Sequence, residues 1–150
     1  MINENVKAKG IVSLVLTDEN GQVKDTQTHN MIMQVGLAYI TSRMKDATAT
    51  AMSHMAVGTG TTAAANSQTA LVTESARVAL TSTTQVTTTT TNDAIQYVAT
   101  FNPGTATAAI TEAAILNAAS AGTMLARTVF SVINKGANDT LTITWKITLA

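Results

Sequence analysis

Residues that could perform chemistry are few in this 150-residue chain. The absence of cysteine excludes thiolate catalysis, disulfide bonds and Cys-based metal sites. The two histidines, His29 and His54, are widely separated, and their spacing matches no metal motif. No serine lies in the Gly-x-Ser-x-Gly frame of many hydrolase nucleophiles. We therefore predict no catalytic residue, no metal and no cofactor, and we expect that the protein is not an enzyme.

The segment Gly58-Thr59-Gly60 could belong to a phosphate-binding loop, in which backbone N–H groups bind phosphate oxygens. However, the Gly-Lys-Ser/Thr ending of such a loop is missing, and no strongly helical segment follows. A structural turn is the favoured interpretation.

One carboxylate stands out because of its surroundings. Glu112 lies inside the apolar run from residue 110 to residue 116, and a charge buried there needs a partner. Arg77 and Arg127 are the candidate partners. We predict that Glu112 is at least partly buried and forms a structural ion pair with one of these arginines.

The overall charge of the chain bears on which classes of partner can be expected. Nine basic and nine acidic residues balance, and only 12% of the residues are charged, so no net field favours nucleic acid or an anionic membrane. No run approaches the roughly 20 apolar residues that cross a bilayer. The first residues lack the basic and apolar pattern of a secretory signal. We expect a cytoplasmic site of synthesis, with no membrane and no nucleic acid as partner.

The first elements that would position these residues are two strands. Extended runs over about residues 6–16 and 22–28 flank Asp18-Glu19-Asn20-Gly21, and Asn-Gly is a strong hairpin signal. We therefore predict an amino-terminal hairpin over about residues 6–28. Its first strand is so continuously apolar that we expect at least partial cover on both faces.

One segment has the period of a helix. Its apolar residues recur at steps of four, three and four along one stripe: Met33, Leu37, Ile40 and Met44. This pattern predicts a helix over about residues 31–45, with Asn30 as a possible N-cap. Gly36 costs about 1 kcal/mol in a helix interior relative to Ala, and close packing on the backbone of a sheet would explain it.

The rest of the chain has the alternation and turn residues of antiparallel strands. The expected strands cover residues 77–91, including the threonine tract 87–91, and then 95–101, 109–117, 124–132 and 141–149. We predict a single β-rich domain over residues 1–150 with seven or eight strands and one inserted helix. The expected fold is mainly β, an antiparallel β-sandwich or a jelly-roll-like fold.

Several segments, taken as a series over about residues 29–150, resemble a family of small virion proteins of tailed bacteriophages. In chain order they are HMAVGTGTTA (54–63), TAL continuing through Glu74 to RVAL (69–80), ITEA (110–113), GTMLARTVF (122–130), and NKG (134–136) followed by 140–149. Members of such families are described as capsid cement or decoration proteins and as tail or fibre components. The resemblance implies a structural role and supplies no catalytic residue.

The resemblance implies a protein of the virion, located on the capsid surface and assembled in the host cytoplasm. The expected function is that of a capsid cement or decoration protein that bridges major capsid protein subunits and stabilises the head. The alternative is a tail or tail-fibre adaptor or receptor-binding protein. With one Trp, two Tyr and two Phe, the core is thin for the chain length, so we also expect burial against other copies in a dimer or trimer.

Overall fold

The computed structural model describes residues 7–29, 34–45 and 50–149. In chain order the elements are β1 (Ala8–Thr17), β2 (Val23–His29), α1 (Gln34–Lys45), β3 (His54–Gly58), β4 (Glu74–Ala79), β5 (Ser82–Val86), β6 (Ala94–Phe101), β7 (Ala108–Leu116), β8 (Met124–Lys135) and β9 (Thr140–Leu149). The predicted antiparallel hairpin at the amino end is formed by β1 and β2.

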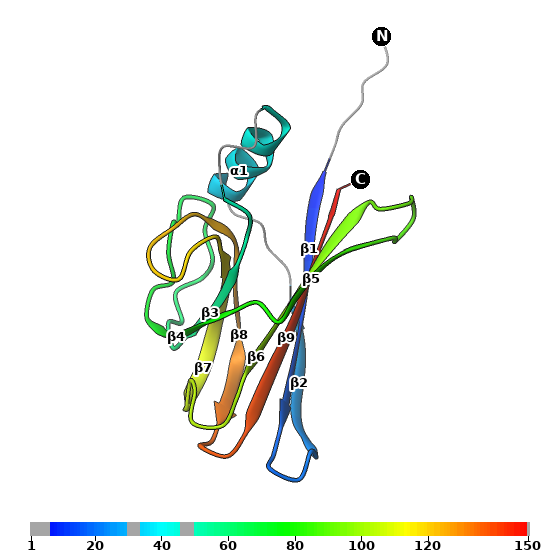
Figure 1. The fold of residues 1–150 in the computed structure, drawn as a ribbon. Helices are drawn as coiled ribbons and strands as arrows, with labels where there is room; N and C mark the ends of the chain where they lie inside the picture. Colours follow the sequence, from blue (N-terminus) through cyan, green and yellow to red (C-terminus); the bar gives the residue numbers. More distant parts are fainter. Residues whose placement is uncertain (1–6, 30–33, 46–49, 150) are drawn as a thin grey trace.

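The strands form two antiparallel sheets that pack face to face (Figure 1). The five-stranded sheet has the order β2-β1-β9-β6-β5, and the four-stranded sheet has the order β4-β3-β7-β8. Helix α1 packs against β8 at one end of the sandwich. The predicted mainly β fold, with the architecture of a β-sandwich and one inserted helix, is confirmed.

The core lies between the two sheets and is built from alternating side chains. In β9, Leu141, Ile143 and Trp145 are buried, whereas the threonines between them are half-buried on the outer face. This alternation arises because β9 is central, paired with β1 on one side and β6 on the other. The apolar outer face of β1 is only partly covered, since Val15 is half-buried and Ile11 is 37% exposed.

The prediction of one strand over residues 77–91 was wrong. Strand β4 lies in the four-stranded sheet and β5 in the five-stranded sheet, and the chain crosses between them at residues 80–81. The threonine tract 87–91 is a loop. Its backbone is organised by the carboxylate of Asp93, which accepts hydrogen bonds from the N–H groups of residues 88–90. These local hydrogen bonds override the preference of β-branched residues for strands.

Helix α1 turns only part of the predicted stripe toward the sandwich. Leu37 and Met44 are exposed, while Tyr39 and Ile40 pack against the core. Gly36 is buried, and a Cβ there would collide with the backbone of Leu125 in β8. The expected close packing of Gly36 on a sheet backbone is confirmed, and this approach sets the orientation of the helix. The predicted residues Asn30 and Met33 lie outside the described part of the chain.

We expect Gly36→Ala to lower the free energy of unfolding, although Ala gains about 1 kcal/mol in helix propensity. The added methyl group would meet the carbonyl of Leu125 in a packed strand, and overpacking of this kind costs about 1–3 kcal/mol. Urea denaturation measures the difference. The control, Ala38→Gly on the exposed side of α1, should lose only the propensity term of about 1 kcal/mol. A Gly36→Ala protein as stable as the wild type would contradict this packing.

Candidate functional site

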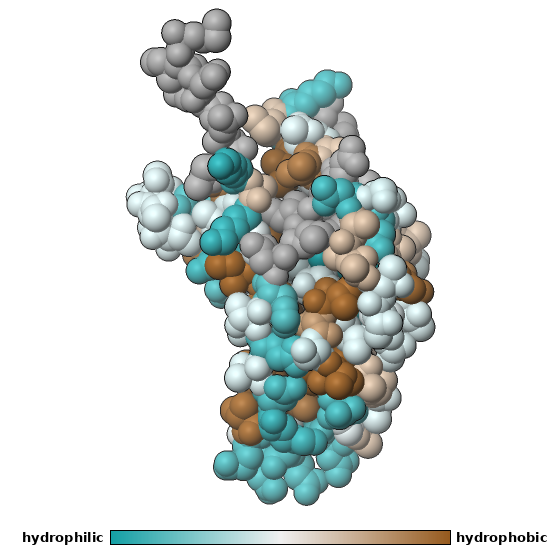
Figure 2. Space-filling model, turned by 180° about the vertical axis from the view of Figure 1, so that it is seen from behind, coloured by the Kyte–Doolittle hydropathy of each residue, from teal (hydrophilic) through white to brown (hydrophobic). Residues whose placement is uncertain are grey.

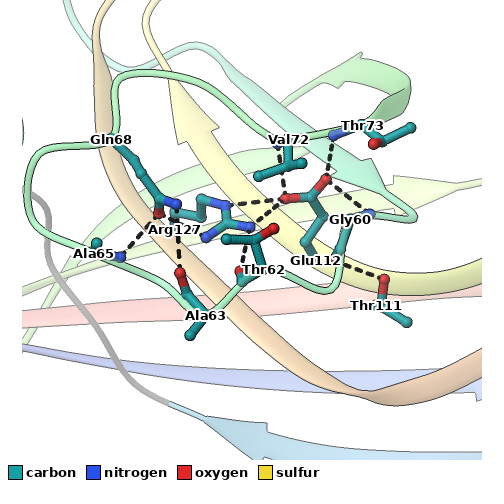
Figure 3. Close-up of polar contacts among 10 residues, drawn as sticks. All are labelled: Gly60, Thr62, Ala63, Ala65, Gln68, Val72, Thr73, Thr111, Glu112 and Arg127. Atoms are coloured by element: carbon teal, nitrogen blue, oxygen red, sulfur yellow. Dashed lines mark hydrogen bonds and ion pairs between the residues drawn. The ribbon is translucent and has the colours of Figure 1, made fainter.

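The most extensive buried polar contact in the described structure joins Glu112 of β7 to Arg127 of the adjacent strand β8 (Figure 3). Both side chains are 0% exposed. The Nε and Nη2 atoms of Arg127 donate to Oε2 of Glu112 at 3.0 and 2.7 Å. Of the two arginines that the sequence offered as partners, the structure therefore brings Arg127 to Glu112.

The Glu112 carboxylate also binds both ends of one loop. This segment, residues 59–73 between β3 and β4, is called the covering loop here. Oε1 of Glu112 accepts hydrogen bonds from the N–H groups of Gly60 (3.1 Å) and Thr73 (2.7 Å). Oε2 accepts one from the N–H of Val72 at 3.1 Å. One carboxylate thus closes the base of the covering loop.

Arg127 binds the middle of the same loop. Its Nη1 donates to Oε1 of Gln68 at 2.7 Å, and its Nη2 donates to the carbonyl oxygen of Thr62 at 3.0 Å. The same oxygen of Gln68 accepts the N–H of Ala65. Burying two charges is costly unless each is paired and its remaining hydrogen bonds are made, and here these conditions are met. We call this pair, with its hydrogen bonds to the loop, the loop clamp.

Two glycines make room for the loop clamp. A Cβ at Gly58 or at Gly60 would lie within 2.7 Å of Oε1 of Glu112, and one at Gly58 would also collide with the carbonyl of Thr73. The Gly58-Thr59-Gly60 segment therefore does place a backbone N–H on an anion, but the anion is the protein's own carboxylate. The sequence-based prediction missed the contact between this glycine segment and Glu112. The signal that could have indicated it was the combination of two closely spaced glycines and a single carboxylate in an apolar strand.

The covering loop lies over the outer face of the four-stranded sheet, opposite the main core. Beneath it lies a second apolar cluster of buried residues: Ala56, Leu71, Ala114, Leu116 and Met124. Leu71 comes from the loop itself, and Ala64 of the loop packs at the margin. The loop clamp and this cluster together fix a long irregular segment on the sheet, so its outer side forms a defined surface.

Arg77, the other predicted partner, is used elsewhere. Its Nη2 and Nε atoms bind the carboxylate of Glu74 at 2.7 and 2.9 Å. Its Nη1 donates to the carbonyl oxygens of Ala118 and Ala121, both at 2.9 Å. Arg77 therefore holds the loop between β7 and β8 against β4. Its side chain is 10% exposed and that of Glu74 is 34% exposed, so this pair is more open to solvent than the loop clamp.

A third polar group of residues organises the turn between β8 and β9. Asp139 accepts hydrogen bonds from Nζ of Lys24 at 2.5 Å and from the N–H of Gly136 at 2.7 Å. The Lys24 hydrogen bond, followed by that of Gly136, holds the pKa of Asp139 below its ordinary value. Lys135 is 2% exposed and donates to the carbonyl oxygen of Asn102, and burial lowers the pKa of this lysine.

The two histidines that were considered as metal ligands lie in separate places. Nδ1 of His54 lies 2.8 Å from Oγ of Ser53, and the ring of His29 lies 5.8 Å from that of Phe130. Within the described ranges, no group of three or more His, Cys, Asp or Glu side chains could hold a metal ion.

A small cavity of about 170 Å³ separates α1 from one end of the five-stranded sheet. Its lining is mainly apolar and includes Tyr39, Tyr97 and Leu125. Burial, and then the neighbouring Tyr39, raises the pKa of Tyr97 to about 12. The phenol of Tyr97 thus remains protonated at neutral pH. The lining also includes Asp93, whose carboxylate already accepts hydrogen bonds from the threonine tract.

Comparisons of the chain with protein-family models, with curated proteins and with solved structures find no match. The helix described here is too short to reach across a bilayer.

We expect Glu112→Gln to destabilise the protein by about 3–5 kcal/mol, because it leaves the guanidinium of Arg127 buried without a counter-charge. Urea denaturation measures this loss. Hydrogen exchange should also accelerate at the amides of Gly60, Val72 and Thr73, which donate to the carboxylate. The control Glu74→Gln, in the more exposed pair, should cost clearly less than Glu112→Gln, because solvent reaches the carboxylate of Glu74. Equal losses in the two variants would contradict the loop clamp.

We expect Asp139→Asn to lower stability at neutral pH and to matter less in acid. The pKa of Asp139 is lower in the folded protein than its ordinary value of 3.8, so the carboxylate stabilises the fold above that value. The contribution is lost as the pH falls through the folded pKa. The urea midpoints of variant and wild type should therefore converge as the pH falls below about 4. A gap that stays constant from neutral pH to acid would show that Asp139 does not act through its charge.

Proposed function

We propose that this protein is a structural component of a phage particle, a capsid cement or decoration protein that bridges major capsid protein subunits on the head surface. The observation that carries the proposal is where the motif series lies in the fold. Segments 54–63, 69–80, 110–113 and 122–130 supply Gly60, Val72 with Thr73, Glu112 and Arg127. The residues that carry the family resemblance therefore converge on the loop clamp and the surface that it holds.

A surface of this kind suits adhesion between proteins. A loop that is already fixed loses little conformational entropy when a partner binds, which leaves more of the contact energy as affinity. Val72, at the base of the covering loop, is 49% exposed and provides an apolar contact point. A cement protein performs no bond-breaking step. It stabilises a shell by adding contact area across subunit joints, and many modest contacts sum through multivalency.

The distribution of apolar side chains over the protein surface is also suited to many weak contacts. On the face shown in Figure 2, apolar side chains form separate spots among polar ones. The exposed large apolar residues come from six different elements and loops: Ile11, Val23, Leu37, Met44, Val72, Val132 and Leu149. Zero net charge avoids long-range repulsion between closely spaced copies.

The burial of the aromatic side chains weighs against the alternative, a receptor-binding module that recognises glycans. Such modules present exposed aromatic rings and polar groups to sugars. Here Trp145, Phe101, Phe130 and Tyr97 are buried, and Tyr39 is half-buried against the core. A tail adaptor, which would bind another protein, is the second candidate because members of the resembling family include tail components.

Particles of the phage that encodes this chain provide the test. We expect cryo-EM reconstructions to place the protein on the outer surface of the head, in contact with at least two major capsid protein subunits. Heads that lack the protein should open at a lower temperature than complete heads, because the added contacts across subunit joints are missing. Addition of the purified protein should restore the opening temperature.

Two matched variants locate the contact surface in the same assay. Val72→Lys, on the covering loop, should reduce rebinding to heads, whereas Val23→Lys, which is also exposed but lies on β2, should rebind like the wild type. Density confined to the tail would contradict the cement function and favour the adaptor.

A further inference from the structure

Strand β5 is an edge strand without the usual protection. Each sheet ends in two edge strands, which are β2 and β5 in one sheet and β4 and β8 in the other. Natural proteins protect exposed edges with charged residues, proline or covering segments, because unpaired backbone groups attract other strands. The sequence of β5 is Ser-Thr-Thr-Gln-Val, with no ionisable residue and no proline, and its first four residues are exposed.

The other three edges carry charges or are covered. Strand β2 contains Lys24 and Asp25, and its Gln27 donates a hydrogen bond to the carbonyl oxygen of Ser131 in β8. Strand β8 is flanked by β2 and α1. Strand β4 carries the Glu74–Arg77 ion pair. Among the described strands, β5 alone therefore has a neutral, exposed edge composed of residues that favour strands.

The hairpin of β5 and β6 is held in shape at both ends. At its base, the N–H of Thr81 donates to the carbonyl oxygen of Val98 at 2.7 Å. At its tip, the carboxylate of Asp93 accepts the N–H groups of residues 88–90 and the hydroxyls of Thr88 and Thr89. Figure 1 shows this tip standing away from the body of the sandwich. The edge is therefore presented in a fixed, extended form.

We propose that β5 pairs with β5 of a second copy of this chain, in an antiparallel arrangement around a two-fold axis at Thr84. The two five-stranded sheets would then form one continuous sheet across the dimer. This inference deepens the proposed function, on which it rests for its use in a particle, by naming the surface through which copies meet.

The composition of β5 makes a second copy a suitable partner. Around this axis Thr84 lies opposite Thr84, Thr83 opposite Gln85, and Ser82 opposite Val86. None of these pairs opposes like charges, and Thr–Thr and Thr–Gln pairs can form hydrogen bonds between side chains. The whole chain has zero net charge, so two copies approach without long-range repulsion.

The small size of the contact limits how strong the pairing can be. A pair of five-residue strands buries less than the roughly 800 Å² per partner of a standard interface. We therefore expect weak association in dilute solution that becomes effective when copies are held close together on a surface.

The purified chain tests this pairing by crosslinking, because the protein contains no cysteine. Directly opposed residues in antiparallel strands lie close enough for a disulfide bond. Thr84→Cys should therefore form disulfide-linked dimers in a glutathione redox buffer at least ten times faster than the control Thr26→Cys. Thr26 is an exposed threonine on β2, the opposite edge of the same sheet. Equal rates for the two variants would overturn the proposal.

Sedimentation velocity at increasing concentration provides the second readout. The wild type and Thr26→Lys should form dimers as the concentration rises, whereas Thr84→Lys, which opposes two charges at the axis, should remain monomeric. Both lysines are placed at exposed positions, and circular dichroism checks that the variants are folded. Dimers that persist in Thr84→Lys, or that disappear in Thr26→Lys alone, would overturn the proposal. Because no particle is present, failure here leaves the cement function to be judged by the head assay.

Discussion

The outer surface of the four-stranded sheet depends on one buried ion pair. The carboxylate of Glu112 accepts five hydrogen bonds, three from backbone N–H groups of the covering loop and two from Arg127. Each interaction is strong because both side chains are fully buried, and each would be costly to lose for the same reason. A loop of fifteen residues without regular structure, 59–73, is thereby attached to the sheet at its base and in its middle. The proposed contact surface of the protein exists because of this arrangement.

Much of the fold and part of this site could be predicted from the sequence. Alternation in β6 and β9 and the Asn-Gly turn predicted the strands, and an acidic residue in an apolar run predicted a buried pair. The choice of partner could not be predicted, because Arg77 and Arg127 lie in one row across the sheet, each opposite an alanine, Ala56 and Ala114. Only strand order places Arg127 on the strand next to Glu112 and Arg77 two strands away.

The errors of the sequence-based predictions have a common physical cause. Propensity and periodicity describe a residue's own preference, whereas the threonine tract is governed by local hydrogen bonds to Asp93 and α1 by a contact with β8. Asp93 folds the tract 87–91 into a loop by accepting its N–H groups. Gly36 orients α1 because only a residue without a side chain can lie against the backbone of Leu125. The sequence indicated that Gly36 packs closely on a sheet, but it did not indicate that the partner is Leu125 of β8.

The crossing between the two sheets has a mechanical consequence. At residues 80–81 the N–H of Leu80 donates to the carbonyl oxygen of Ser53, beside β3, and the N–H of Thr81 donates to that of Val98 in β6. Two successive peptide groups thus fasten the same short segment to opposite layers. A force applied to the projecting hairpin of β5 and β6 would act on both sheets at this point. The strands of one sheet would therefore not separate one after another. If the protein has its proposed place on a capsid, such load sharing would resist tearing when the shell is under internal pressure.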